Sequence, residues 1–179
     1  MYKRLIIVLL AASLVFAGLF ASQYLQNQSI KRSMLGQYVI AQHNISGHLN
    51  NAVEYHLAGD NSDFIISLQN VAGEFRAVDS IIAPGSLLGL HTKASGLMYT
   101  IHANQMNFIN NSLDKAVNDE LYDEDLNRII SFTEAMAYYA DLLNYDELVL
   151  GNSPARIVNR IDDKLEQTSQ LHSGKNFEQ

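Results

Sequence analysis

Residues 5–21 read LIIVLLAASLVFAGLFA, a run without a charged residue that directly follows Lys3 and Arg4. A membrane-spanning helix needs roughly 20 apolar residues, and residues 22–25 can extend this run through the interface. Tyr2 and Tyr24 lie 22 positions apart, about 33 Å along a helix, which suits aromatic anchors at the two headgroup regions. We therefore predict a transmembrane signal anchor over residues 1–25.

A cleaved signal peptide is the alternative interpretation of this run. Its apolar core is usually about 7–15 residues long and ends in a small-x-small cleavage site. Leu19-Phe20-Ala21 has a large residue where a small one is needed, and Val15-Phe16-Ala17 lies inside the apolar run. We therefore favour an uncleaved anchor. Lys3 and Arg4 favour a cytoplasmic N-terminus, so the prediction is a single-pass protein with an extracytoplasmic body; cleavage would instead release a secreted body.

Charge and cysteine content exclude several function classes. The chain has 19 acidic and 12 basic residues, and without Lys3 and Arg4 the remainder carries a net charge of −9. We therefore predict no nucleic-acid partner, because phosphate binding needs a basic patch. The sequence has no cysteine, which excludes disulfides, thiolate metal sites and a lipoprotein anchor.

The rest of the chain has helical periodicity. Residues 26–58 are predicted to form one helix continuous with the anchor, because apolar and small residues recur there at heptad spacing. Gly36 and Gly47 could bend this helix, and Gly59 should end it. We divide the chain into the anchor, a helical stalk over residues 26–37, a bundle over residues 38–172 and a disordered tail over residues 173–179. The predicted seam consists of Leu35, Tyr38, Gln42, Ile45, Leu49, Ala52 and His56.

Four further helices are predicted, over residues 63–82, 87–117, 125–147 and 154–171. Short connections make neighbouring helices antiparallel, so the fold class is all-α: an up-and-down bundle of four long helices and a shorter fifth. The turn at Asp60 and the acidic segment near Asp123 should then lie far from the membrane, and Pro84-Gly85 close to it. The predicted stripes include Phe64, Leu68, Val71, Ala72, Phe75 and Val78; Leu87, Leu90, Ala94, Leu97, Ile101 and Phe108; Leu126, Ile129, Met136, Tyr139 and Leu143; and Ile157, Ile161, Leu165 and Thr168.

Two groups of residues could carry chemistry. Met98, His102 and Met106 have the spacing i, i+4, i+8, and thioether and imidazole groups are soft ligands for copper or haem iron. Methionine also fills gaps in cores, and we favour a core stripe. Asp119, Glu120 and the acidic residues 123–125 could collect a divalent cation, but they lack the glycine turn of a calcium loop, so a solvated helix cap is favoured.

Polar residues at predicted seam positions leave three interpretations open. Gln42, His56, Asn104 and Asn111 could specify helix register, line a small polar cavity or face solvent. The sequence contains no nucleophile–base motif, no phosphate-binding loop and no Glu-x-x-His pair of the kind that holds a di-iron site. We therefore predict a protein that is not an enzyme, with no catalytic, cofactor-binding or metal-binding residue and no cofactor.

The predicted architecture resembles the membrane-tethered sensing bundles of bacterial chemoreceptors, although the sequence has no second apolar run. The resemblance implies binding of a small ligand or metal as one function. The function that we favour is a non-catalytic envelope or interaction component. Its predicted partners are the lipid bilayer and a protein with a basic patch. Ser13, Ala17 and Ala21 form a small-residue stripe that could also pair two copies of the chain.

Overall fold

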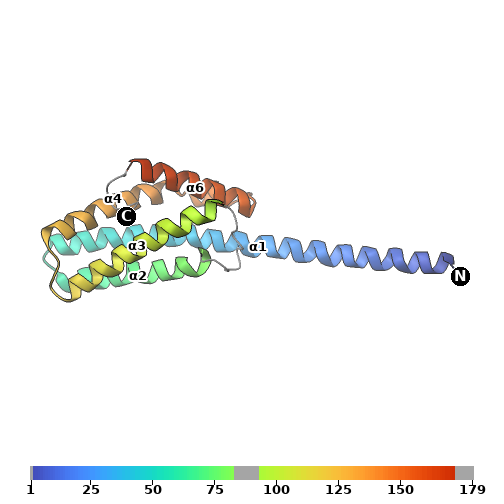
Figure 1. Cartoon of the computed structure of the whole chain (residues 1–179), viewed down its shortest axis with the longest axis horizontal. Coiled ribbons are helices and arrows are strands. Elements are labelled where there is room, and N and C mark those ends of the chain that lie inside the picture. Colours follow the sequence, from blue (N-terminus) through green and yellow to red (C-terminus); the bar gives the residue numbers. More distant parts are fainter. Residues whose placement is uncertain (1, 83–92, 172–179) are drawn as a thin grey trace.

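The computed structural model describes the backbone of residues 2–82 and 93–171, and the side chains of residues 12–82 and 100–171. This part of the chain is helical and contains no strand, which confirms the predicted all-α class. Figure 1 shows one long helix that runs the length of the molecule, with the other helices gathered around its C-terminal half. The elements are α1 (Tyr2–Leu57), α2 (Asn61–Ile82), α3 (Lys93–Val117), α4 (Asp123–Leu142), α5 (Tyr145–Leu148) and α6 (Pro154–Leu171).

Helix α1 is continuous, and its two halves have different surroundings. Neither Gly36 nor Gly47 interrupts it. Its described N-terminal side chains are mostly exposed, whereas from Leu35 onward one face is buried. Six of the seven predicted seam residues are buried, and the seventh, His56, is partly exposed. The buried ones are Leu35, Tyr38, Gln42, Ile45, Leu49 and Ala52.

A tight turn reverses the chain between α1 and α2. Gly59 adopts a φ of 78°, a left-handed conformation that costs glycine little, and its N–H donates to the His56 carbonyl at 3.0 Å. Asp60 caps α2, because its Oδ1 accepts from the N–H of Asp63 at 3.1 Å. The apolar stripe of α2 is buried as predicted, and α2 packs along α1.

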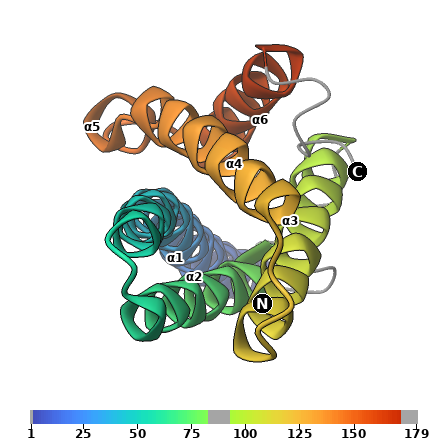
Figure 2. The same ribbon diagram turned by 90° about the vertical axis from the view of Figure 1, so that its left-hand side faces the viewer.

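Figure 2 looks along the bundle and shows α1, α2, α3 and α4 around a common interior. Helix α2 packs on α1 and α3, α4 packs on α1, and α6 contacts α1, α3 and α4. The interior is filled by large side chains from several helices, among them Phe64, Phe75, Ile109, Phe132 and Tyr139, which are at most 1 % exposed. This arrangement confirms the helical bundle.

The predicted helix over residues 125–147 is in fact two helices. Helix α4 ends at Leu142, and α5 begins at Tyr145. The break occurs because Asn144 acts as an N-cap: its Oδ1 accepts from the N–H groups of Asp146 and Glu147 at 3.0 and 3.2 Å. The structure therefore has six helices within its described residues, not five.

Helix α5 packs tightly on α1. A Cβ atom at Gly36 would lie 3.0 Å from the Tyr145 ring, so a side chain there would force the ring to move. Helix α6 begins at Pro154 as predicted, and the Ser153 Oγ accepts from the N–H of Arg156 at 3.4 Å.

The buried face of α3 differs from the predicted one. Asn111 is exposed and Phe108 only half-buried, whereas His102, Gln105 and Ser112 are buried beside Ile101 and Ile109. The predicted stripe followed the apolar residues, but the packed face of α3 includes several polar ones. Leu87, Leu90, Ala94 and Leu97 lie outside the described side chains, as does the turn at Pro84-Gly85.

The packing of α2 predicts a large effect of Leu68→Asp. Leu68 is fully buried, and an unpaired buried charge costs several kcal/mol, against a total stability of about 5–15 kcal/mol for a domain. Chemical denaturation followed by circular dichroism should show loss of the cooperative transition. The matched control is Ile66→Asp on the same helix, where Ile66 is 48 % exposed and the change should be about 0.5 kcal/mol or less. Equal effects of the two variants would contradict this packing.

Candidate functional site

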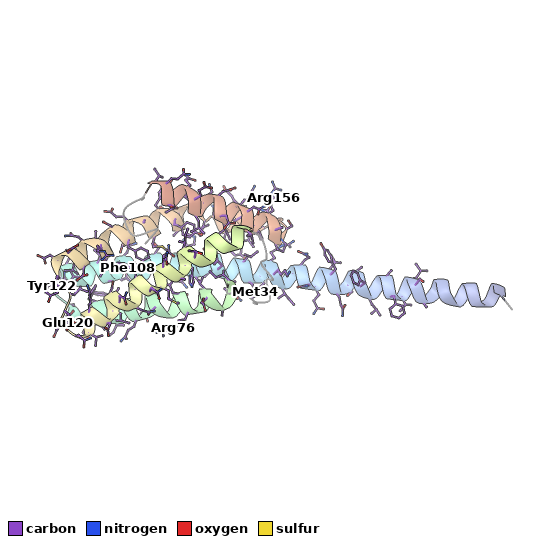
Figure 3. All side chains as sticks on the ribbon, in the orientation of Figure 1. Met34, Arg76, Phe108, Glu120, Tyr122 and Arg156 are labelled. Atoms are coloured by element: carbon purple, nitrogen blue, oxygen red, sulfur yellow. The ribbon has the colours of Figure 1, made fainter. Side chains whose placement is uncertain are left out.

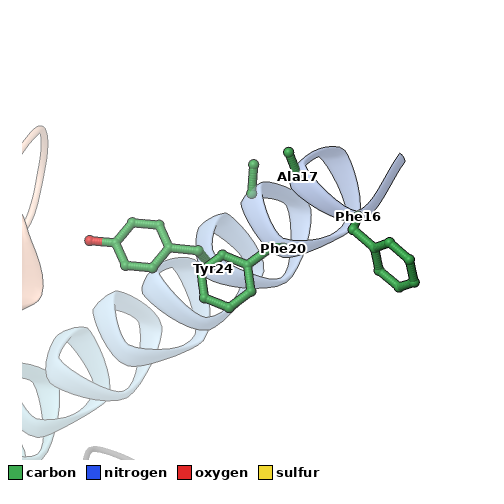
Figure 4. A pocket seen from close by; sticks show the side chains of 5 residues that line it. Phe16, Ala17, Phe20 and Tyr24 are labelled. Carbon is green, nitrogen blue, oxygen red and sulfur yellow. The ribbon is translucent and has the colours of Figure 1, made fainter. Parts of the chain in front are cut away.

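Residues 14–25 of α1 form an exposed apolar segment, here called the apolar segment. Its large side chains, including Leu14, Phe16 and Phe20, are between 59 and 75 % exposed. Figure 4 shows Phe16, Ala17, Phe20 and Tyr24 along this stretch of α1, and Figure 1 shows the N-terminal part of α1 extending away from the other helices. Soluble proteins rarely leave a contiguous apolar surface of this kind uncovered.

The predicted anchor extends beyond the side chains that the structure describes. Within the described part of the chain, where side chains begin at Ala12, no helix offers a stretch apolar enough to cross a membrane. Residues 5–11, the most apolar part of the predicted anchor, lie before Ala12 and so outside the described side chains.

The acidic residues lie at the opposite end of the molecule, which we call the distal tip. It comprises the α1–α2 turn and residues 117–125. Figure 3 shows Glu120 and Tyr122 there, far from the apolar segment. Asn61 and Asp119 line one hollow of about 140 Å³, so the two connections meet as predicted.

The five acidic side chains of residues 119–125 do not gather around one point. Asp125 has a structural role, because both of its carboxylate oxygens are hydrogen-bonded. One oxygen accepts from the Lys115 ammonium at 2.6 Å, and the other accepts from the Tyr122 N–H at 3.2 Å. The Lys115 hydrogen bond lowers the Asp125 pKa. Asp119, Glu120, Asp123 and Glu124 remain exposed. The cap interpretation therefore fits Asp125, and the other four form an acidic surface.

Apolar side chains accompany these carboxylates at the distal tip. Leu57, Val117 and Tyr122 are 75, 56 and 71 % exposed. Tyrosine is enriched at protein-binding surfaces and is often one of the few residues that carry most of the binding energy.

Of the group Met98, His102 and Met106, His102 is the residue whose surroundings the structure defines most fully. It lies between α2 and α3, 5.3 Å from the Phe75 ring and with its Nε2 4.0 Å from the Asp79 carboxylate. Neither ring nitrogen has a hydrogen-bond partner. Burial lowers the His102 pKa to about 4, against the opposing effect of Asp79. His102 is therefore neutral at pH 7.

The other members of this group do not complete a site in the described part of the chain. Met106 is partly buried against the core, and the side chain of Met98 lies outside the described residues. Within the described residues, no three His, Cys, Asp or Glu side chains are grouped as metal ligands. That no metal binds here stays a prediction.

A polar cluster that the sequence analysis did not predict lies where α6 meets α1 and α4. The hydroxyls of Tyr38 and Tyr139 are 2.8 Å apart and form a buried hydrogen bond. Burial raises the pKa of both phenols, and the Asp162 charge raises it further. Asp162 is only 9 % exposed, and neither carboxylate oxygen has a hydrogen-bond partner.

One sequence signal could have identified Asp162. It is four residues after Val158 and three before Leu165, and both of these are buried, so it lies on the apolar stripe of α6. Of the polar seam residues named from the sequence, Gln42 is the only buried one, and its Oε1 also lacks a partner. His56 and Asn104 are partly exposed and Asn111 faces solvent.

Comparison with known proteins found no matching family model, no matching curated protein and no matching solved structure.

The contacts of Asp125 predict that it stabilises the fold and that its neighbours do not. Asp125→Asn should lower the free energy of unfolding by about 1 kcal/mol, because the variant weakens the helix cap and the Lys115 ion pair. Asp123→Asn, an exposed residue of the same helix turn, is the matched control and should change it by about 0.5 kcal/mol or less. Urea unfolding of both variants measures the difference. Equal values would show that Asp125 has no special structural role.

Proposed function

We propose that this chain is a non-catalytic, membrane-tethered helical bundle that presents an acidic surface to a protein partner. The observation that carries this proposal is the apolar segment of α1, which leaves large side chains uncovered next to the charge-free residues 5–11. Moving a leucine or phenylalanine side chain out of water contributes about 1.5–3 kcal/mol. Residues 14–20 alone therefore favour an apolar environment by on the order of 10 kcal/mol.

A bilayer is the environment that fits a helix apolar on all sides. A partner protein would cover one face, whereas Leu14, Val15, Phe16 and Leu19 point in different directions around the helix axis. All four are at least 60 % exposed. Lys3 and Arg4 favour a cytoplasmic N-terminus, which would place the bundle outside the cytoplasm.

Helix α1 sets the distance between membrane and tip. Gln26 to Leu57 corresponds to roughly 50 Å of helix, several times the Debye length of about 8 Å at physiological salt. The exposed carboxylates of the tip would therefore act on a partner without interference from anionic lipid. A partner with a basic patch around an apolar centre would complement the four exposed acids and Tyr122.

The ligand-sensing alternative receives less support from the described residues. A pocket for a small molecule usually has about 300–1,000 Å³. The hollow between α1 and α2, lined by Gln37, Ile40, Asn44 and Glu74 among others, has about 250 Å³, and the one at the tip about 140 Å³. Among the described histidines, His102 is enclosed beside Phe75. His43 is exposed, and its Nε2 lies 2.9 Å from the Leu143 carbonyl oxygen.

The membrane part of the proposal is tested by alkaline extraction of membranes that contain the full-length protein. We expect the protein to stay in the membrane pellet with its N-terminal residues present, because an apolar helix of this length does not leave a bilayer. Replacing Leu14, Phe16 and Leu19 by Asp should release it. Release of the unaltered protein, or a mature N-terminus near Ser22, would contradict the anchor.

The partner part is tested by charge neutralisation at the distal tip. Replacing Asp119, Glu120, Asp123 and Glu124 by Asn or Gln should weaken capture of a crosslinked partner and reduce the salt dependence of capture, because rim charges act mainly on association. Asp125 is left intact because the fold uses it. The matched control neutralises Asp141, Asp146, Glu147 and Glu166, which are exposed elsewhere. Equal capture by both variants would contradict a binding role of the tip.

A further inference from the structure

Asp162 lies in an environment that does not suit a carboxylate. It belongs to the face of α6 that packs into the bundle, and both of its oxygens are buried without a hydrogen-bond partner. An ionised carboxylate at this position has lost its hydration and gained no protein donor in exchange. Such a group favours its neutral form, because protonation removes the charge that burial penalises.

Among the described residues, no positive charge offsets the carboxylate charge of Asp162. The Asp162 charge raises the pKa of Tyr38 of α1 and Tyr139 of α4, but both phenols are neutral and form a hydrogen bond to each other. On α6 itself, the adjacent Asp163 adds a second negative charge. Asp162 takes part in neither the Lys115–Asp125 ion pair nor the His102–Asp79 contact.

Three basic groups on α1, α6 and α3 have other partners in the described part of the chain. Arg32 of α1 donates to the Asn152 carbonyl at 3.0 Å, and Arg160 of α6 donates to the Glu147 carbonyl of α5 at 2.8 Å. On α3, His102 faces Asp79 of α2. Burial, assisted by Asp163, consequently raises the Asp162 pKa to about 7.

We propose that Asp162 is a proton-binding site that controls how firmly α6 is seated on α1, α3 and α4. When Asp162 is protonated, the face of α6 is neutral and packs against the Tyr38–Tyr139 pair. When it is ionised, the carboxylate regains its hydration only if α6 moves away from the bundle.

The direction of the pH dependence follows from proton linkage. The Asp162 pKa is raised from 3.8 to about 7 in the packed state, so the packed state binds the proton more tightly than the opened state. The stabilisation is fully present below about pH 4 and is lost as the pH rises to about 7. Within this window the opening equilibrium of α6 should increase by up to about tenfold per pH unit, because opening releases one proton.

Hydrogen exchange of the full chain in lipid nanodiscs tests the proposal directly. Protection factors of α6 amides, corrected for the intrinsic pH dependence of exchange, should fall more than about tenfold between pH 5 and pH 7. In Asp162→Asn this fall should disappear. The matched control is Asp163→Asn, which removes the neighbouring exposed carboxylate. This variant should retain the fall in protection, shifted to lower pH, because the Asp163 charge raises the Asp162 pKa.

Three results would overturn the proposal. They are α6 protection that does not change with pH in the unaltered protein, a fall that persists in Asp162→Asn, and an equal fall over α2, which would place the effect on global unfolding. If Asp162→Asn does not fold, Asp162→Leu provides a second variant without a titratable group. The comparison of α6 with α2 in the unaltered protein decides the question independently of either variant.

Discussion

The structure depends on one helix that passes through two environments. Between Leu14 and Leu25, α1 exposes apolar side chains in several directions; from Leu35 onward, it buries one face beneath α2, α4 and α6. Because the same helix serves both parts, the bundle cannot rotate or tilt independently of the apolar segment while α1 stays straight. The buried face of α1 therefore positions α2, α4, α5 and α6 relative to the proposed membrane anchor, and α3 is held by α2 and α6.

Polar groups interrupt this seam at the places where later helices join it. Tyr38 bonds to Tyr139, Gln42 leaves an unpartnered oxygen, and α6 brings Asp162 to the same junction. A wholly apolar junction would be simpler to stabilise, because unpaired buried polar groups cost free energy. The junction of α6 with α1 and α4 thus contains a buried carboxylate that has no hydrogen-bond partner. The distal tip contrasts with it, because Asp125 has two partners and its unpartnered neighbours face water.

The sequence predicted those features that arise from local pattern. The heptad spacing of Leu35, Ile45 and Leu49, the stripe of α2 and the Pro154 start of α6 follow from amphipathicity and capping, and the structure confirms them. It did not predict the end of α4, because Asn144 can sit in a helix or cap a new one, and only the packing of Tyr145 on Gly36 favours the second. Asp162 was also missed. A charged residue is normally assigned to solvent, and its burial is set by how α6 crosses α1 and α4.

A distance between two spin labels on α1 tests the continuity of this helix most directly. The chain has no cysteine, so Gln23→Cys and Asn50→Cys place labels only at these two exposed positions. An unbroken helix in nanodiscs predicts a narrow distance distribution centred at about 40 Å. A broad distribution, or one centred well below this value, would show a bend near Gly36 or Gly47. It would contradict the claim that one rigid helix joins the apolar segment to the core of the bundle.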